Sequence, residues 1–418
     1  MVIVLLIFVG LAVLCDDYLV PWLQKIQRVC GMSDDMAGVT LVAFGSAAPE
    51  LVISTVSVLS NDNKVGVGII CGSAIIAFGL IPAACFFAVN KPLLLNNWLV
   101  CRDVLFYLLG ASLLMLYFFI HDGNITIWEA LSLVGLYAVY IVVTVFVPCA
   151  PAAASESESR EAPGGSDESS ALLEEANGAA DPEKSADADG EEKTAPGNKD
   201  GDGESSDSCG SVANVVYSTV AAGFTFLFSW TIPAPPDEDS TDSNLDVATV
   251  VGTFMTFLYL AALSYGAYYD IVYLCNQTPY LSKEAAGAVL LAAGAQIPDL
   301  LASVAMTKAG MPDGAISSAI SSQVIVVTLG LGLPWVIYIA YNGGTVNYAT
   351  SMRTQTTDLT LFLITAGVAV LYLATTVSWR GGESARLTLP KVSIQLAGFV
   401  LAYVAFITIE VLHEVGLM

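Results

Sequence analysis

Two acidic residues lie within apolar runs of this chain, where an ionised side chain is costly to bury. Glu50 lies in the run GVTLVAFGSAAPELVIS, and Asp299 lies in the run GAVLLAAGAQIPDLLAS. Each acid directly follows a proline, and a proline within a helix removes the hydrogen bond to the carbonyl four residues earlier. The carbonyls freed in this way would be those of Gly45 and Gly294. Carboxylate and carbonyl oxygens suit hard cations, so we predict a Ca²⁺ or Na⁺ site with Glu50 and Asp299 as its charged ligands.

Hydroxyl side chains are spaced so that they can join the two acids. Ser46 lies one helical turn before Glu50 and Ser54 one turn after it, so the three share a face. Ser303 likewise lies one turn after Asp299. Two carboxylates neutralise one Ca²⁺, and the same two can accept monovalent cations or protons when Ca²⁺ is absent. Competition for one site is the simplest physical basis for exchange. The alternative is that the acids only satisfy neighbouring hydroxyls between closely packed helices.

The two acids occupy equivalent places in an internal repeat. Residues 33–80 align without a gap on residues 282–329, and the acid follows its proline in both copies. Matching ionisable groups in duplicated apolar segments indicate one site at a pseudo-twofold axis. That arrangement is typical of secondary transporters.

Composition places the chain in a membrane. It has 418 residues, of which 55% are hydrophobic and 13% charged, and its mean hydropathy is +0.68. Apolar runs long enough to cross a bilayer recur along it. We predict transmembrane helices near residues 2–22, 35–60, 65–89, 100–120, 127–147, 246–273, 284–307, 313–341, 358–378 and 391–412. The fold class is therefore an all-α polytopic membrane protein, with ten transmembrane helices as two inverted five-helix repeats.

The distribution of basic residues orients these helices. If the N-terminus lies outside, most Lys and Arg residues of the short connecting segments lie on the cytoplasmic side, in line with the positive-inside rule. The glycosylation sequons at Asn124 and Asn276 then fall on outer turns. The apolar stretch 2–14 lacks a basic flank and a cleavage site, so we expect a retained helix.

The net charge of the whole chain is −24, and its acidic residues are concentrated in the middle. Residues 148–213 are rich in Ala, Ser, Glu, Asp and Gly, which predicts a disordered acidic cytoplasmic loop. It separates a first membrane half, residues 1–147, from a second, residues 246–418. Residues 214–245 form a predicted interfacial helix and linker. We expect the apolar stretch Val212–Ile232 to lie at the cytoplasmic interface or re-enter the membrane, because a full span would make the repeats parallel.

Nothing in the chain indicates an enzyme. It has two histidines, no nucleophile elbow and no phosphate-binding loop. We expect no cofactor besides the transported ions, and no nucleic-acid partner, with the lipid bilayer as the environment. The residues leave open whether the membrane is the plasma membrane or an internal one, and whether the protein is a monomer or a homodimer.

Several motifs resemble those of one transporter family. They are Cys15-Asp-Asp-Tyr-Leu-Val-Pro21, Gly45-Ser-Ala-Ala-Pro-Glu50, Val67-Gly-Ile-Ile-Cys-Gly-Ser73, Ala292-Ala-Gly-Ala-Gln-Ile-Pro-Asp299 and Gly330-Leu-Gly-Leu-Pro-Trp335. With these motifs the chain resembles the cation/calcium exchanger superfamily, most closely the potassium-dependent sodium/calcium exchangers. The resemblance implies Ca²⁺ bound between the acids of helices 2 and 7. It also implies that Na⁺ enters as Ca²⁺ leaves, with K⁺ cotransported in the potassium-dependent branch.

The chain also departs from the pattern of that family. The family has a hydroxyl residue at Ala47, Ser at Gln296 and Asn at Ala77, and an acid or Asn at Val326, where the acid is associated with K⁺ dependence. The oxygen ligands that remain are those of Ser46, Glu50, Ser73, Asp299 and Ser322. We therefore expect Ca²⁺ exchange for monovalent cations without a requirement for K⁺. The alternatives are an H⁺-coupled Ca²⁺ exchanger, a transport-inactive Ca²⁺-binding relative, or a channel.

Overall fold

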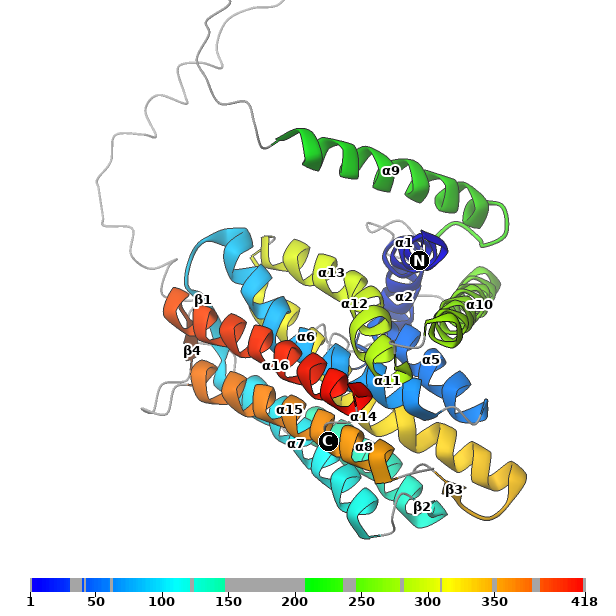
Figure 1. Ribbon diagram of the computed structural model, residues 1–418. Coiled ribbons are helices and arrows are strands. Elements are labelled where there is room, and N and C mark those ends of the chain that lie inside the picture. Colours follow the sequence, from blue (N-terminus) through cyan, green and yellow to red (C-terminus); the bar gives the residue numbers. More distant parts are fainter. Residues whose placement is uncertain are drawn as a thin grey trace, which may run out of the picture. The chain divides into compact units, whose positions relative to one another are not determined.

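The computed structural model of the chain is almost entirely helical (Figure 1). It describes residues 2–30, 40, 43–60, 63–120, 124–146, 207–235, 246–278, 282–308, 310–347, 352–377 and 384–415. The chain divides into two compact units, one formed by Met1–Ala150 with Val216–Met418 and the other by Pro151–Val215. The predicted disordered loop, residues 148–213, lies almost entirely outside the described residues, and the account below concerns the first unit.

Helices account for both halves of this unit. The first half contains α1 (Val2–Leu14), the π-helix η1 (Cys15–Leu19), α2 (Val20–Cys30), α4 (Ala43–Ser46), α5 (Ala48–Leu59), α6 (Asn63–Val89), α7 (Asn97–Ile120) and α8 (Ile127–Phe146). After α9 (Asp207–Ser229), the second half contains α10 (Val247–Gln277), α11 (Lys283–Ala285), the π-helix η3 (Ala286–Leu291), α12 (Ala292–Ala295), α13 (Ile297–Lys308), α14 (Pro312–Asn342), α15 (Met352–Thr376) and α16 (Leu389–Val415).

Nine stretches among the described residues are long and apolar enough to cross a membrane. They are Ile3–Cys30, Val65–Val89, Asn97–Ile120, Ile127–Phe146, Val247–Gln277, Lys283–Lys308, Pro312–Asn342, Leu359–Thr376 and Leu389–Ile409. Each corresponds to one of the ten predicted helices. The remaining predicted helix, residues 35–60, is described only in part, as α4 and the shorter apolar helix α5. The protein is therefore a multi-pass integral membrane protein.

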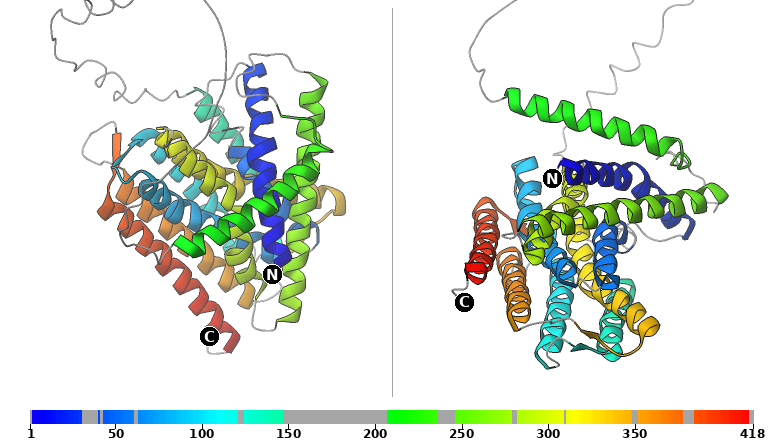
Figure 2. Two further views of the ribbon diagram at one scale, coloured as in Figure 1. Left: turned by 90° about the horizontal axis from the view of Figure 1, so that it is seen from above. Right: turned by 45° about the vertical axis from the view of Figure 1, so that its right-hand side comes forward.

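The helices α6 and α14 are the most buried of these spans and carry much of the core. In the described structure α6 packs against α5, η3, α13, α14, α15 and α16, whereas α14 packs against α5, α6, α7, α8 and α13. The helices α1 and α10 pack against each other and lie side by side in Figures 1 and 2. The acids of the two halves therefore lie on helices that share α6 and α14 as neighbours.

The backbones of α6 and η3 touch where glycines face each other. A Cβ atom added to Gly72 would lie 2.1 Å from the carbonyl oxygen of Ala288. One added to Gly287 would lie 2.7 Å from the carbonyl oxygen of Val65. No side chain larger than hydrogen fits at such distances, and small residues are what allow membrane helices to approach this closely.

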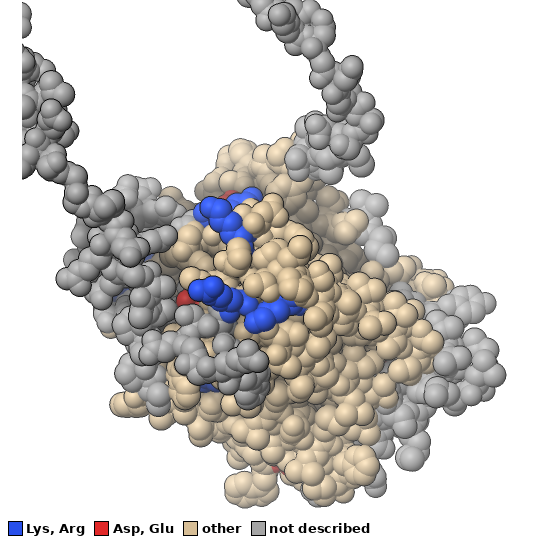
Figure 3. Space-filling view, turned by 90° about the vertical axis from the view of Figure 1, so that its left-hand side faces the viewer, with Lys and Arg blue, Asp and Glu red and all other residues tan. Residues whose placement is uncertain are grey.

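Two short antiparallel ladders connect the halves. In the first, β1 (Leu93–Asn96) pairs with β4 (Ser384–Leu387), with Leu93 opposite Leu387. In the second, β2 (Asn124–Ile125) pairs with β3 (Val346–Asn347). Figure 3 shows Lys and Arg side chains close together on the face where β1 and β4 lie. Arg386 is on β4 and Lys91 precedes β1, so both belong to the connecting segments next to this ladder.

The helix α9 covers most of the stretch Val212–Ile232, where a helix was predicted, and its first residues, 207–213, lie within the segment predicted to be disordered. Phe228 makes edge-on contacts with Tyr18 of η1 and Tyr259 of α10, with ring centroids 5.8 and 5.3 Å apart. The Tyr18 hydroxyl also donates to the carbonyl of Thr225 at 3.5 Å. The end of α9 thus packs across α1 and α10, as Figure 2 shows. Its location relative to a bilayer stays a prediction.

A salt bridge joins the middle of α2 to the start of α10. The Nζ atom of Lys25 lies 3.1 Å from Oδ1 of Asp246. Asp246 is also the N-cap of α10, because its side chain accepts from the Thr249 backbone N–H at 3.1 Å and from the Thr249 hydroxyl. The hydrogen bonds from Thr249 and from Lys25 hold the pKa of the Asp246 carboxyl at about 2.

This depressed pKa predicts an acid-sensitive contribution to stability. The carboxyl has a pKa of about 3.9 when unfolded, so its contribution is fully present above that pH and is lost as the pH falls towards about 2. The melting temperature of Asp246→Asn should lie below that of wild type at neutral pH, and the difference should shrink below about pH 4. Asp270→Asn on the same helix is the control. A difference that is equally large at pH 7 and pH 2.5 would contradict this role.

Candidate functional site

The two acids lie at equivalent positions because the same local break occurs twice. Glu50 is the third residue of α5 and Asp299 the third of α13, and a proline is the second residue of each helix. A proline is tolerated in the first turn of a helix, where its missing N–H has no partner to lose, so each helix starts again there. The break itself is at Ala47 in one copy and at Gln296 in the other. Each acid therefore lies near the positive end of a helix dipole, which favours negative charge.

The side chains of the two acids converge on one amide. The Nε2 atom of Gln296 lies 2.9 Å from Oε1 of Glu50 and 3.5 Å from Oδ2 of Asp299. Glu50 is fully buried and Asp299 is 5% exposed. The structure thus brings the acids of the two repeats together, and their role as one ion site stays a prediction. Gln296 was treated only as a departure from the family pattern. Its position three residues before Asp299, on the same helical face, was the signal that could have identified it.

A row of hydroxyl and amide groups extends from Asp299. The Ser322 hydroxyl donates to Oδ2 of Asp299 at 3.3 Å, whereas the Ser46 hydroxyl donates to the carbonyl of Ala43 at 3.1 Å and lines the same cavity as Asp299. Nε2 of Gln323 lies 3.2 Å from the Ser322 hydroxyl, and the Ser73 hydroxyl donates to Oε1 of Gln323 at 3.1 Å. Of the predicted hydroxyl ligands, Ser322 therefore contacts an acid directly, and Ser73 is joined to Ser322 through Gln323.

The other two predicted serines contact backbone groups of α14 instead. The Ser54 hydroxyl donates to the carbonyl of Gly330, and the Ser303 hydroxyl donates to the carbonyl of Ala315 at 3.2 Å. Each lies one turn from its acid, as the spacing predicts, but its hydroxyl ties α5 or α13 to α14. These serines therefore support the helices that carry the acids.

The glycines before each acid make room for the N-terminal helices. A Cβ atom on Gly45 would lie 2.4 Å from Leu23 of α2, and one on Gly294 would lie 2.1 Å from the ring of Phe8 on α1. The Gln296 backbone N–H is directed to the carbonyls of Ala292 and Gly294. Whether the Gly45 and Gly294 carbonyls bind an ion stays a prediction.

Two buried oxygens of the site have no hydrogen-bond partner within the described structure. They are Oε2 of Glu50 and Oε1 of Gln296. A buried acceptor without a donor costs about 1–3 kcal/mol, and more when the acceptor is charged. Both atoms belong to the pair of side chains that meet between the repeats.

A cavity of about 30 Å³ reaches the site from the side of η1 and α2. Its lining includes Cys15, Ser46, Asp299, Ser303 and Met306. This volume accommodates about one water molecule or a small dehydrated ion. The positions where the family carries further oxygen ligands, Ala77 and Val326, are fully buried and apolar. No group of three or more His, Cys, Asp or Glu side chains that could hold a metal ion occurs among the described residues.

Two broken helices, one from each repeat, that bring buried carboxylates to one amide are typical of a membrane transporter for cations. The sodium/calcium exchanger protein family matches residues 1–146 and 274–411, so this chain belongs to that family. It is 27% identical to sodium/potassium/calcium exchanger 5 of Homo sapiens, over all of this chain and 83% of that protein. It is 39% identical to sodium/potassium/calcium exchanger 3 of Homo sapiens, over 34% of this chain and 22% of that protein.

One similar solved structure shows the fold. The crystal structure of the H⁺/Ca²⁺ exchanger CAX superposes with a TM-score of 0.55 and 13% identity, covering 98% of this chain and 85% of that one. The family predicted from the paired motifs is therefore confirmed, and so is the fold class. Because the family consists of exchangers, the expectation of a transporter agrees with it.

Proposed function

We propose that this chain is a secondary active transporter that exchanges Ca²⁺ for monovalent cations. The observation that carries the proposal is the convergence of two buried carboxylates, Glu50 and Asp299, on one point between the repeats. Two negative charges match the charge of one Ca²⁺, and burial makes an unbalanced pair costly. A site of this kind favours a bound cation at all times, so the departure of Ca²⁺ is coupled to the arrival of other cations.

The neutral oxygens near the acids complete a coordination set of the kind that Ca²⁺ uses. Ca²⁺ takes six to eight oxygen ligands in flexible geometry. Besides the carboxylates of Glu50 and Asp299, the hydroxyls of Ser46 and Ser322 are close, and the amide oxygen of Gln296 is available. The small cavity that reaches Asp299 supports the entry of one ion, without most of its water, from that side.

We further propose Na⁺ as the main counter-ion, with no requirement for K⁺. The relatives named above are sodium/potassium/calcium exchangers, which supports Na⁺. Ala77 and Val326 provide no side-chain oxygen, so a separate K⁺ site lacks the acid associated with K⁺ dependence. A second candidate function is a transport-inactive Ca²⁺-binding relative. It is favoured by the Gln296 amide, whose nitrogen lies between the two acids where a cation would sit.

Reconstituted full-length protein tests these alternatives. Uptake of radioactive Ca²⁺ into proteoliposomes should follow an outward Na⁺ gradient, should persist without K⁺, and should not follow a pH gradient alone. Glu50→Gln serves as the inactive control. Uptake driven only by a pH gradient would replace Na⁺ by H⁺, and uptake without any counter-ion would indicate a channel. Ca²⁺ binding without uptake under any gradient would identify the inactive relative.

A further inference from the structure

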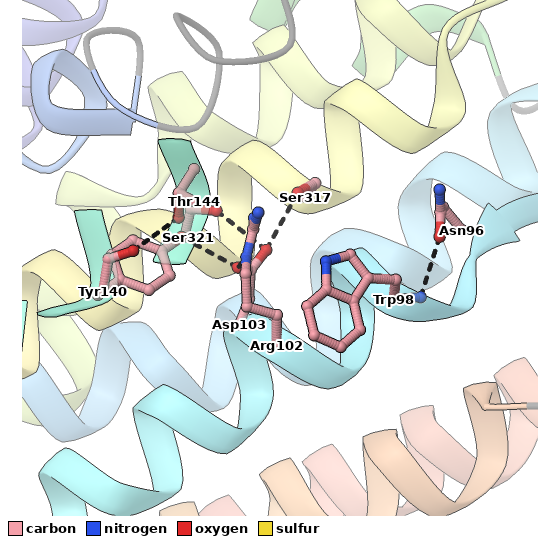
Figure 4. Close-up of polar contacts among 8 residues, drawn as sticks. All are labelled: Asn96, Trp98, Arg102, Asp103, Tyr140, Thr144, Ser317 and Ser321. Carbon is pink, nitrogen blue, oxygen red and sulfur yellow. Dashed lines mark hydrogen bonds and ion pairs between the residues drawn. The ribbon is translucent and has the colours of Figure 1, made fainter. Parts of the chain in front are cut away.

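A second buried polar network lies on another face of α14, away from the two acids. Its centre is Asp103 on α7, which is fully buried, next to Arg102, which is 4% exposed. The Nε atom of Arg102 lies 2.7 Å from Oδ1 of Asp103. The Tyr140 hydroxyl of α8 donates to the same oxygen at 3.0 Å, and the Arg102 guanidinium lies 5.6 Å from the Tyr140 ring centre. Figure 4 shows these side chains pointing towards one another.

The other oxygen of Asp103 holds α14. The hydroxyls of Ser317 and Ser321, one turn apart on that helix, both donate to Oδ2 of Asp103 at 3.1 Å (Figure 4). One carboxylate thus accepts hydrogen bonds from three helices. The two serines define one face of α14, because residues four apart lie above each other on a helix.

Stability alone does not explain a charged pair at this place. Removing two charges from water costs as much as their attraction returns, and apolar residues of similar volume often serve as well. Hydrogen bonds differ from apolar contacts in being directional. Two serines bound to one carboxylate therefore define how α14 is rotated about its axis, which apolar packing alone leaves less well defined.

The rotation of α14 decides where the next two residues point. Ser322 directly follows Ser321 and donates to Asp299, and Gln323 contacts Ser322 and Ser73. A rotation that moved Ser321 off Asp103 would turn Ser322 away from Asp299 by the same angle. The network at Asp103 and the polar row at Asp299 are thus two faces of one rigid helix.

We propose that Asp103 is a positioning residue for cation exchange. By binding Ser317 and Ser321, it holds α14 in the rotation that directs Ser322 and Gln323 into the site of Glu50 and Asp299. The inference rests on the proposed function, because it takes that site to be the one that binds Ca²⁺. What Asp103 contributes is its hydrogen-bond acceptors, and its negative charge serves only to balance Arg102.

Three full-length variants test the proposal by Ca²⁺ uptake and by thermal melting with and without Ca²⁺. Ser317→Ala/Ser321→Ala removes the two donors on α14 and should raise the half-saturating Ca²⁺ concentration about tenfold, with a smaller change in maximal rate. Arg102→Gln/Asp103→Asn removes both charges but keeps an acceptor for the serines. It should stay within about twofold of wild type. Thr328→Val removes a buried hydroxyl of α14 that bonds only within its own helix, and it should leave the half-saturating concentration unchanged.

The outcomes separate positioning from simple structural support. If Ser317→Ala/Ser321→Ala lowers the melting temperature but keeps the wild-type half-saturating concentration, Asp103 only stabilises the fold and the proposal is wrong. If Arg102→Gln/Asp103→Asn raises the half-saturating Ca²⁺ concentration as much as Ser317→Ala/Ser321→Ala does, the charge of Asp103 matters and the proposal is also wrong. If Arg102→Gln/Asp103→Asn does not fold, the half-saturating Ca²⁺ concentration of Ser317→Ala/Ser321→Ala alone decides between positioning and structural support. Failure of the wild type to bind Ca²⁺ would instead reject the proposed function, and this inference with it.

Discussion

Replacement of Glu50 by glutamine is expected to abolish Ca²⁺ transport, with uptake at least about a hundredfold below wild type. The substitution keeps the shape of the side chain and keeps an oxygen that can accept from Nε2 of Gln296. It removes one of the two negative charges that would balance Ca²⁺, in a fully buried place where water cannot substitute. In the empty protein it also removes one of two buried acids that lie beside the same amide, so the melting temperature should not fall.

A second buried acid provides the matched control. Glu129 is 7% exposed and accepts from the backbone N–H and the hydroxyl of Thr126 at the start of α8. Glu129→Gln keeps an oxygen that can accept from Thr126 but removes a negative charge from the first turn of α8, so it should lower stability by about 0.3–1 kcal/mol and leave Ca²⁺ uptake per folded molecule unchanged. Uptake and Ca²⁺-dependent melting, measured on both variants, should thus give opposite patterns. Normal uptake by Glu50→Gln would rule out the proposed site.

Replacement of Gly72 by alanine is expected to be as damaging, for a different reason. The added Cβ atom would lie 2.1 Å from the carbonyl oxygen of Ala288, and also 2.7 Å from the carbonyl carbon. A backbone carbonyl cannot rotate away as a flexible side chain can, so α6 and η3 must separate. We expect a loss of about 3 kcal/mol or more in stability. Because Ser73 is the next residue, and η3 leads through α12 to Asp299, the separation should also displace ligands of the site.

The measurement is the melting temperature of the purified protein together with its Ca²⁺ uptake. Gly135→Ala is the control, since a Cβ atom there meets no atom within 4 Å and alanine is the better helix former by about 1 kcal/mol. Gly72→Ala should yield little folded protein, and what folds should need more Ca²⁺. Wild-type melting and uptake in Gly72→Ala would mean that the two backbones are not this close.

The acids and the helices that carry them could be predicted because their signals are local. An ionisable residue within an apolar run, a proline before it, and a second copy of both are visible without any knowledge of packing. The comparison of repeats then placed Glu50 opposite Asp299, and Gln296 Nε2 contacts both. The predicted transmembrane helices agree with the described ones for the same reason, because the hydropathy that places a segment in a bilayer is a property of that segment by itself.

The partners that complete the site depend on contacts far apart in the chain. Ser317 and Ser321 are 214 and 218 residues from Asp103, and neither spacing nor hydropathy relates them. Asp103 itself lies inside a predicted helix and was not singled out. Ser54 and Ser303 were predicted as ion ligands, but their hydroxyls donate to carbonyls of α14. Helical spacing predicts the face on which a hydroxyl lies but not which acceptor it finds there.

The two short ladders impose an order on the biogenesis of this protein. Each ladder takes one strand from the first half and one from the second, so β1 leaves the ribosome long before β4 exists. At usual rates of synthesis this interval is on the order of tens of seconds, during which the edge of β1 has no partner. The first half is therefore inserted into the membrane before β4 has been made. During that time the unpaired edge of β1 is exposed to chaperones or to pairing with another chain. Although the sequence contains an internal repeat, its two halves are expected to fold poorly as separate polypeptides.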